Sequence, residues 1–369
     1  MRAIKFPAII VLIECAIRSA GFSYPQLKLL SVVRNIRYNM CNPSEVFRHG
    51  DREINDEIGG DLTQVGRLRA YRLGEILRVR YGDFLGEEYE PSRLYARSTE
   101  YIRAKMSLQL LLAGLFVPRE QQRWHESLDW QPIPFSYARS KEDVLLFPRD
   151  CPSFQREMKR FIPSPGFQKL LDPYREMMRN VTIWTGQEMS IPNHMFVLYH
   201  KLSSMQALDE PLPKWSRDFF PYGLLLNGTY LEYDTHKYTD WMRRVNGGTL
   251  VRKIIDDMLN RTDEKYPRKR DVYLYSGHEL NVVSILQSLK IWQPHIPEYS
   301  SAVIVELRED RKNYYVKVLY HKGIPPIFKE MQIPGCPSLC PLDRFIELLS
   351  DNLPAYDEII CDDKTVKFE

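Results

Sequence analysis

The stretch Val46-Phe47-Arg48-His49-Gly50-Asp51-Arg52 places one histidine between two arginines, and the interpretation of the whole chain depends on it. A neutral imidazole can act as a nucleophile without first losing a proton. Neighbouring guanidinium groups disfavour the imidazolium form and keep a ring lone pair free into mildly acid pH. The same groups present planar donor forks that match phosphoryl oxygens. The heptad therefore predicts a phosphate-binding loop that carries its own nucleophile.

Gly50 supports this interpretation, because it lacks the side chain that would hold the backbone away from a ligand. The alternative is an ordinary charged turn in solvent, since Arg-His-Gly alone is a weak motif. Two other segments favour a site. Arg97-Ser98-Thr99 follows a short strand predicted at Leu94–Ala96. Gly277-His278-Glu279 follows a strand predicted at Asp271–Tyr275.

Polar residues that follow strands indicate a binding site, because α/β folds bind ligands at the carboxyl ends of their strands. We therefore expect Arg97 and His278 to point toward the heptad. For Arg97 taken alone, a surface salt bridge is the alternative interpretation.

Apolar spacing predicts strands and helices at both ends of the chain and mostly helices between them. Outside the central region it predicts a strand at Leu27–Val33, helices at Leu62–Tyr81, Glu100–Leu112, Leu280–Leu289 and Pro341–Leu353, and a hairpin of Ser301–Leu307 with Tyr314–Tyr320. The central helices are predicted at Phe154–Phe161, Phe167–Met178, His194–Met205, Tyr238–Val245 and Val251–Leu259. These patterns divide the chain into a leader at 1–24, a first α/β part at 25–142, an α-helical insertion at 143–269 and a second α/β part at 270–369.

The composition is that of an ordinary globular protein that can bury a large core. The chain has 369 residues, of which 44% are hydrophobic and 27% charged, and its formal net charge is +3 without long charge runs. This balance does not indicate a nucleic-acid surface. No apolar stretch is long enough to span a bilayer, so we expect no membrane anchoring.

The N-terminus has the features of a signal peptide. Arg2 and Lys5 precede the apolar run Pro7–Ile13, and small residues follow at 19–21. The alternative is a buried first strand or helix.

The cysteines and glycosylation sequons are typical of a secreted glycoprotein. Cys15 lies in the leader, and the remaining five leave one thiol unpaired, for which Cys41 is the candidate. Cys336 and Cys340 are spaced to close a small loop, and Cys151 could reach Cys361. Acceptor sequons occur at Asn180, Asn227 and Asn260.

Several segments together resemble the histidine acid phosphatase superfamily, and more closely the secreted insect acid phosphatases, including hymenopteran venom enzymes. Besides the heptad they are Leu62–Arg67, Ala96–Thr99, Trp130–Pro134, Leu146–Cys151, Tyr275–Glu279 and Pro297–Ser301. The resemblance covers the chain from about Leu27 to its end. It implies an α/β fold with a mixed, largely parallel sheet flanked by helices, as in phosphoglycerate mutases, and an inserted α-helical domain that forms one wall of the cleft.

The resemblance also implies roles for individual residues. His49 would accept the phosphoryl group, and Glu279 would give a proton to the leaving oxygen. Arg48, Arg52, Arg97 and His278 would bind the phosphoryl oxygens. The substrate would be a small phosphomonoester, with no cofactor and no metal, and a homodimer is an expectation because relatives are often dimers.

Two features depart from this family. Arg34–Glu45 separates the predicted first strand from Val46, and the loop after Arg52 is short. If the insertion is real, we expect it to be looped out, with Val46 and Phe47 ending the strand; the other interpretation is an error in the assembled coding sequence. A catalytically impaired or silent secreted or venom glycoprotein of the same fold is therefore the alternative function. A cytosolic mutase-like enzyme is a third hypothesis, which the leader, sequons and cysteines disfavour.

Overall fold

The computed structural model describes residues 39–53, 60–266, 270–323, 325–362 and 364–365. These residues all belong to one compact unit of the chain, Arg37–Glu369. The predicted leader and the strand predicted at Leu27–Val33 lie outside the described residues.

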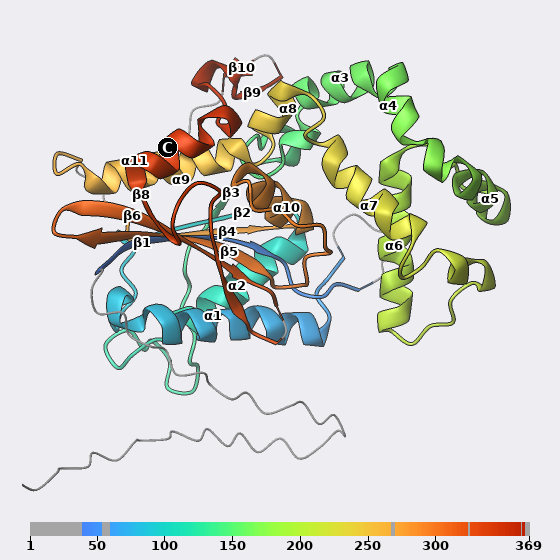
Figure 1. Ribbon diagram of the computed structural model, residues 1–369. Coiled ribbons are helices and arrows are strands. Elements are labelled where there is room, and N and C mark those ends of the chain that lie inside the picture. The colour runs from blue at the N-terminus through green and yellow to red at the C-terminus, as the bar shows by residue number, and fades with distance from the viewer. Residues whose placement is uncertain (1–38, 54–59, 267–269, 324, 363, 366–369) are drawn as a thin grey trace, which may run out of the picture. The chain divides into compact units, whose positions relative to one another are not determined.

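A mixed β-sheet lies between two layers of helices (Figure 1). Its strands are β1 (Asn39–Arg48), β2 (Leu94–Ser98), β3 (Ser136–Tyr137), β4 (Val272–Gly277), β5 (Ala302–Asp310), β6 (Asn313–His321), β7 (Phe328–Met331) and β8 (Leu339–Pro341). The order is β3-β2-β4-β1-β5-β6-β7, and β8 also pairs with β6. The first four neighbours are parallel and the pairs from β1–β5 onward are antiparallel. The predicted fold class is confirmed. A separate ribbon joins β9 (Ile360–Cys361) to β10 (Lys364–Thr365).

Helices cover both faces of the sheet (Figure 1). Helices α1 (Gln64–Leu85) and α2 (Ile102–Leu115) pack on one face, and α9 (Gly248–Thr262), α10 (Glu279–Ser288) and α11 (Leu342–Leu349) pack on the other. Helices α1 and α2 approach very closely, since a side chain at Gly74 would place its Cβ 2.1 Å from the Leu111 carbonyl oxygen. No helix in the described part of the chain is both long and apolar enough to cross a membrane.

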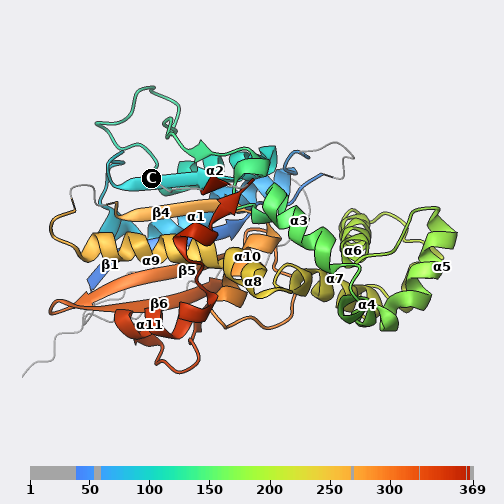
Figure 2. The same ribbon diagram turned by 90° about the horizontal axis from the view of Figure 1, so that it is seen from above.

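A second group of helices has its own hydrophobic core (Figure 2). It contains α3 (Pro152–Phe161), α4 (Pro165–Leu170), α5 (Arg175–Thr185), α6 (Pro192–Ala207), α7 (Leu224–Thr235) and α8 (Asp240–Val245). The single helix predicted at Phe167–Met178 is wrong, because Asp172-Pro173 interrupts it. Helix α7 was not predicted. Helix α9, which lies within the insertion predicted at 143–269, packs against the sheet.

The prediction that Arg34–Glu45 is looped out is wrong for its described part. Residues 39–45 form most of β1, which pairs with β5 from Asn39 and with β4 from Ser44 onward. Asn42-Pro43 locally favours a turn, but pairing with β5 outweighs that local preference. Pro43 is tolerated beside an irregularity in the pairing between Met40 and Asn42.

This strand places polar side chains in the core. Asn42 and Ser44 are fully buried and Glu45 is 2% exposed. Asn42 Oδ1, Ser44 Oγ and Glu45 Oε1 have no hydrogen-bond partner among the described residues. Buried polar atoms without partners destabilise a fold, so β1 carries an energetic cost in the centre of the sheet.

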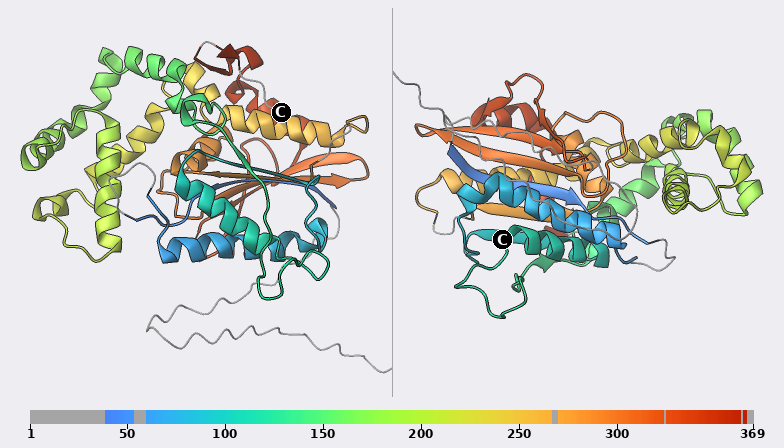
Figure 3. Two further views of the ribbon diagram at one scale, coloured as in Figure 1. Left: turned by 180° about the vertical axis from the view of Figure 1, so that it is seen from behind. Right: turned by 90° about the horizontal axis from the view of Figure 1, so that it is seen from below.

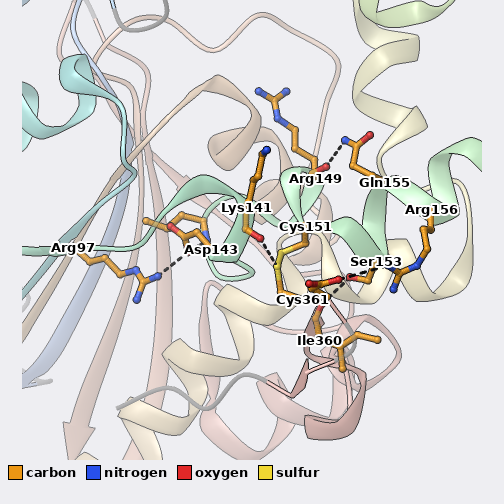
Figure 4. The surroundings of a disulfide bond; sticks show 12 residues. Arg97, Lys141, Asp143, Arg149, Cys151, Ser153, Gln155, Arg156, Ile360 and Cys361 are labelled. Carbon is orange, nitrogen blue, oxygen red and sulfur yellow. Dashed lines mark hydrogen bonds and ion pairs between the residues drawn. A yellow bond between two sulfur atoms is a disulfide. The ribbon is translucent and has the colours of Figure 1, made fainter.

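Within the described residues the cysteines form two disulfides, Cys151–Cys361 and Cys336–Cys340. The first ties the start of α3 to β9 across 210 positions of sequence (Figure 4). Cys41 is a free, buried thiol, and burial raises its pKa to about 12.

Candidate active site

The site forms where β1, β4 and β2 end side by side. Because these strands are parallel neighbours, the residues that follow them meet at one edge of the sheet, on the side where α6 and α7 lie (Figure 3). The His49 backbone N–H donates to the Gly277 carbonyl at 3.1 Å, and the Thr99 N–H donates to the Ser276 carbonyl at 3.0 Å. The rings of His49 and His278 lie 5.3 Å apart, centroid to centroid. The prediction that the heptad and the segment after β4 converge is confirmed.

His49 has one ring nitrogen free of a proton. Its Nδ1 lies 2.7 Å from the Gly50 carbonyl oxygen, which can only accept, so Nδ1 carries the hydrogen. Its Nε2 accepts a hydrogen bond from Arg103 Nε at 3.1 Å. The ring is therefore a neutral imidazole whose Nε2 lone pair faces the guanidinium groups.

Burial and three positive charges keep this ring neutral. His49 is 4% exposed. Burial lowers its pKa well below the usual value, and the charges of Arg103, Arg48 and Arg52 lower the pKa further. The ring thus remains a potential nucleophile at acid pH.

Gly50 is required for a reason that differs from the one predicted. An added Cβ would lie 2.3 Å from the Gly66 carbonyl oxygen, so the close approach is to the first turn of α1 rather than to a ligand. Thr63 caps that helix by accepting from the Gly66 N–H, and the Gly50 N–H donates to Ser107 Oγ on α2. These contacts fix the position of His49 against both helices.

Arg48 is buried and directed into the site. Its guanidinium lies 4.0 Å above the Tyr299 ring, donates to the Pro297 carbonyl and forms an ion pair of 3.0 Å with Glu279. Within the described structure its Nε has no hydrogen-bond partner although it is buried. A buried donor without a partner is suited to an anion.

Arg97 does not reach the site, and the prediction that it binds phosphoryl oxygens is wrong in this structure. It pairs with Asp143 at 2.7 Å (Figure 4). Successive side chains on a strand point to opposite faces. On β2, Leu94 and Ala96 face α1 and α2, so Arg97 points to the other face.

Arg103 takes the place expected for Arg97. It lies in the first turn of α2, and besides His49 it donates to His278 Nδ1 at 3.4 Å. Burial and the charge of Arg52 lower its pKa to about 10, so it remains cationic. The sequence offered one signal, because Arg103 and Ser107 are four positions apart and share a helix face.

His278 is also neutral. Its Nδ1 accepts from Arg103, so its Nε2 carries the hydrogen and donates to Thr99 Oγ1 at 2.9 Å. Burial, and then the charge of Arg103, lowers its pKa well below the usual value. The ring forms one wall of the site, between His49 and Tyr101.

Glu279 faces the arginines from the first turn of α10. Its carboxylate pairs with Arg48 through Oε2, and Oε1 lies 3.0 Å from His200 Nε2 and accepts from the Tyr233 hydroxyl. Burial alone would raise its pKa, but the charges of His200 and Arg48 outweigh burial and bring the pKa to about 2. His200 on α6 and Tyr233 on α7 were not predicted to belong to the site.

This arrangement can bind a phosphoryl group among guanidinium donors and present a nitrogen lone pair to its phosphorus. The class of protein that this arrangement fits is an enzyme that acts on phosphoryl groups. The profile of the Histidine phosphatase superfamily (branch 2) matches residues 53–182 and 199–321. The chain belongs to this superfamily, and it is an enzyme of the phosphatase class.

Curated relatives support this assignment. Venom acid phosphatase Acph-1 of Apis mellifera is 37% identical over 92% of this chain and 92% of its own length. Prostatic acid phosphatase of Homo sapiens is 31% identical over 84% of each chain. The phytase of Citrobacter braakii, at 16% identity, has a TM-score of 0.62 over 87% of this chain and 99% of its own. The phytase likeness shows the shared fold.

Proposed function

We propose that this protein is a secreted acid phosphatase that hydrolyses phosphate monoesters through a phosphohistidine on His49, with Glu279 as proton donor. The observation that carries the proposal is the neutral, buried His49 ring surrounded by the charges of Arg48, Arg52 and Arg103. Relatives named as acid phosphatases support the same reaction.

In the first step, His49 Nε2 forms a bond to phosphorus while the bond from phosphorus to the ester oxygen breaks. Arg48, Arg52 and Arg103 bind the phosphoryl oxygens, whose charge is best met by fixed donors, and His278 lines the same space. An alkoxide is a poor leaving group, so a proton on the leaving oxygen lowers the barrier. In the second step, water attacks phosphorus and releases His49.

Glu279 is ionised in the free protein, since its pKa is about 2, and it must gain a proton once substrate is bound. A bound phosphoryl group supplies negative charge beside the carboxylate and draws Arg48 toward itself. Both effects favour the protonated carboxyl. Substrate binding therefore prepares the acid that the first step requires.

The same relatives and the sequence support a secreted location. The predicted signal peptide at 1–24, the sequons at Asn180, Asn227 and Asn260, and the likeness to a venom enzyme support secretion; relatives named lysosomal acid phosphatase make the lysosome a second location. The helical insertion and a homodimer remain parts of the proposal. A silent glycoprotein of the same fold is the second candidate, favoured by the polar strand β1.

Glu279→Gln is expected to lower kcat for an alkyl phosphate by about 10²- to 10⁴-fold at acid pH, and far less for 4-nitrophenyl phosphate. The reason is that an aryl oxide leaves without a proton. The measurement compares both substrates for wild type, Glu279→Gln and the control Glu298→Gln, which removes a negative charge near Arg48. Equal losses on both substrates argue against the acid role. Wild-type protein that hydrolyses neither substrate supports the silent glycoprotein.

Arg103→Gln is expected to lower kcat by about 10²- to 10³-fold. The substitution removes a fixed hydrogen-bond donor to the charge that develops on the phosphoryl oxygens in the transition state. Arg97→Gln is its matched control. It breaks a pair with Asp143, which is 1% exposed, so we expect lower thermal stability but near-normal turnover by the folded fraction. Steady-state kinetics and thermal unfolding of both variants separate the two roles. A severe kcat loss confined to Arg97→Gln would reverse the assignment.

A further inference from the structure

We propose that His200, from helix α6, is a positioning residue that delivers the catalytic proton to Glu279. This inference rests on the proposed phosphatase function. It adds a route by which a proton passes from solvent to the Glu279 carboxyl. His200, which provides this route, belongs to helices α3–α8, whose hydrophobic core is separate from that of the sheet.

The contact is direct and lies at the site. His200 Nε2 is 3.0 Å from Glu279 Oε1, and this carboxylate begins α10 beside the nucleophile's loop. The His200 ring packs edge-on against Phe196, one turn earlier on α6, with centroids 4.5 Å apart. This packing fixes which ring edge faces the carboxylate.

The other described partners of Glu279 cannot release a proton at acid pH. Arg48 is a guanidinium, which does not deprotonate in proteins. Burial and the charge of Glu279 raise the pKa of Tyr233 well above its usual value, so its hydroxyl holds its proton. Histidine is the side chain that commonly changes charge between about pH 5 and 8. Among the described partners, His200 alone has the chemistry of a proton source.

His200 is also the partner best placed to exchange protons with water. Its side chain is 13% exposed, whereas the side chains of Glu279 and Arg48 are 6% and 7% exposed. A proton taken from solvent by the outer ring can therefore be passed to the inner carboxyl. The charge of Glu279 also acts on the more distant titratable groups His295, Tyr199 and Tyr320.

The proton that leaves His200 is replaced within one turnover. Once substrate is bound, the proton moves from His200 Nε2 to the Glu279 carboxyl, which passes it to the ester oxygen as the phosphorus–oxygen bond breaks. The electron pair of that bond stays on the oxygen, and the alcohol leaves. In the second step, water forms a bond to phosphorus and gives a proton to Glu279, and the proton returns to His200 Nε2.

The test uses His200→Ala in the full chain, assayed on an alkyl phosphate and on 4-nitrophenyl phosphate from pH 4 to 7. We expect kcat for the alkyl phosphate to fall by about tenfold or more, a smaller effect than removal of a directly acting acid. Turnover of the aryl phosphate should change little. Added imidazole should restore alkyl phosphate turnover, because the removed ring leaves a gap that is open to solvent.

Two further variants keep the test decisive. His200→Gln keeps a hydrogen-bond donor but has no proton to transfer, so it should show the same selective loss. His194→Ala is the control on the same helix, because His194 Nδ1 accepts from the Ser190 N–H. Thermal unfolding reports whether each variant folds.

The outcomes are distinct. Selective loss with imidazole rescue supports the proton route. Unchanged alkyl phosphate turnover in both His200 variants, or equal losses on both substrates without rescue, would overturn it and leave the proposed function standing. Wild-type protein without activity on either substrate would remove the proposed function, and this inference with it.

Discussion

His49→Ala is expected to lose phosphatase turnover by about 10⁴-fold or more while its fold remains, as removal of a nucleophile does in other enzymes. The lost atom is Nε2, whose lone pair lies among the charges of Arg48, Arg52 and Arg103. Folding should persist because the loop is anchored through the backbone of Gly50 rather than through the His49 ring. Rapid-quench kinetics and thermal unfolding measure both properties.

A matched control is His295→Ala. His295 bonds to Tyr320 and to the Gln293 carbonyl, outside the ring of arginines, so turnover should change only slightly. Brief reaction with radiolabelled substrate followed by alkaline quench should trap label on wild type and on His295→Ala, because phosphohistidine survives base. Label or turnover in His49→Ala would place the nucleophile elsewhere.

Glu45→Val is expected to stabilise the fold at neutral pH and to flatten its dependence on pH. Glu45 of β1 lies opposite Leu274 of β4 and Ile304 of β5. Both of these residues belong to the hydrophobic core between the sheet and helices α1 and α2. Burial raises its pKa from 4.5 to about 8. The folded state therefore binds a proton that the unfolded chain releases.

The direction of the pH effect follows from that raised pKa. The contribution of protonated Glu45 is fully present below pH 4.5 and is lost as pH rises to about 8. At pH 7 the wild-type fold should be about 3 kcal/mol less stable than at pH 4 on this account. Denaturant unfolding at several pH values measures the difference between wild type and Glu45→Val. The control is Glu330→Val, whose side chain is 46% exposed and pairs with Lys317. A difference that does not vary with pH contradicts the buried protonated carboxyl.

Much of the site could be predicted from the sequence, because its residues follow strands. The heptad after β1 and the segment after β4 meet since parallel neighbours end at one edge. Arg97 was misplaced because the prediction used its distance from a strand's end but not the alternation of faces along β2. Arg103, His200 and Tyr233 lie on helices, where contact with the site depends on how those helices pack. Local sequence does not give that packing.

The fold prediction failed where tertiary pairing overrides local preference. Asn39–Glu45 has turn-forming residues, yet pairing with β5 along this segment, and with β4 from Ser44 onward, holds it extended. Helix α7 was missed because it is apolar on more than one side and contains Gly228, which lies against Met195 of α6. Both cases need the three-dimensional neighbours to be understood.

Glu279 begins a helix that packs on the sheet, but two of its partners come from helices with a different core. A shift of helices α6 and α7 away from the sheet lengthens the contacts of Glu279 to His200 and Tyr233. The pKa of the Glu279 carboxyl then changes. The relative position of the two groups of helices therefore sets the acidity of Glu279. Substitutions in the core of helices α3–α8 can therefore shift the pH optimum of the enzyme, although they do not contact His49.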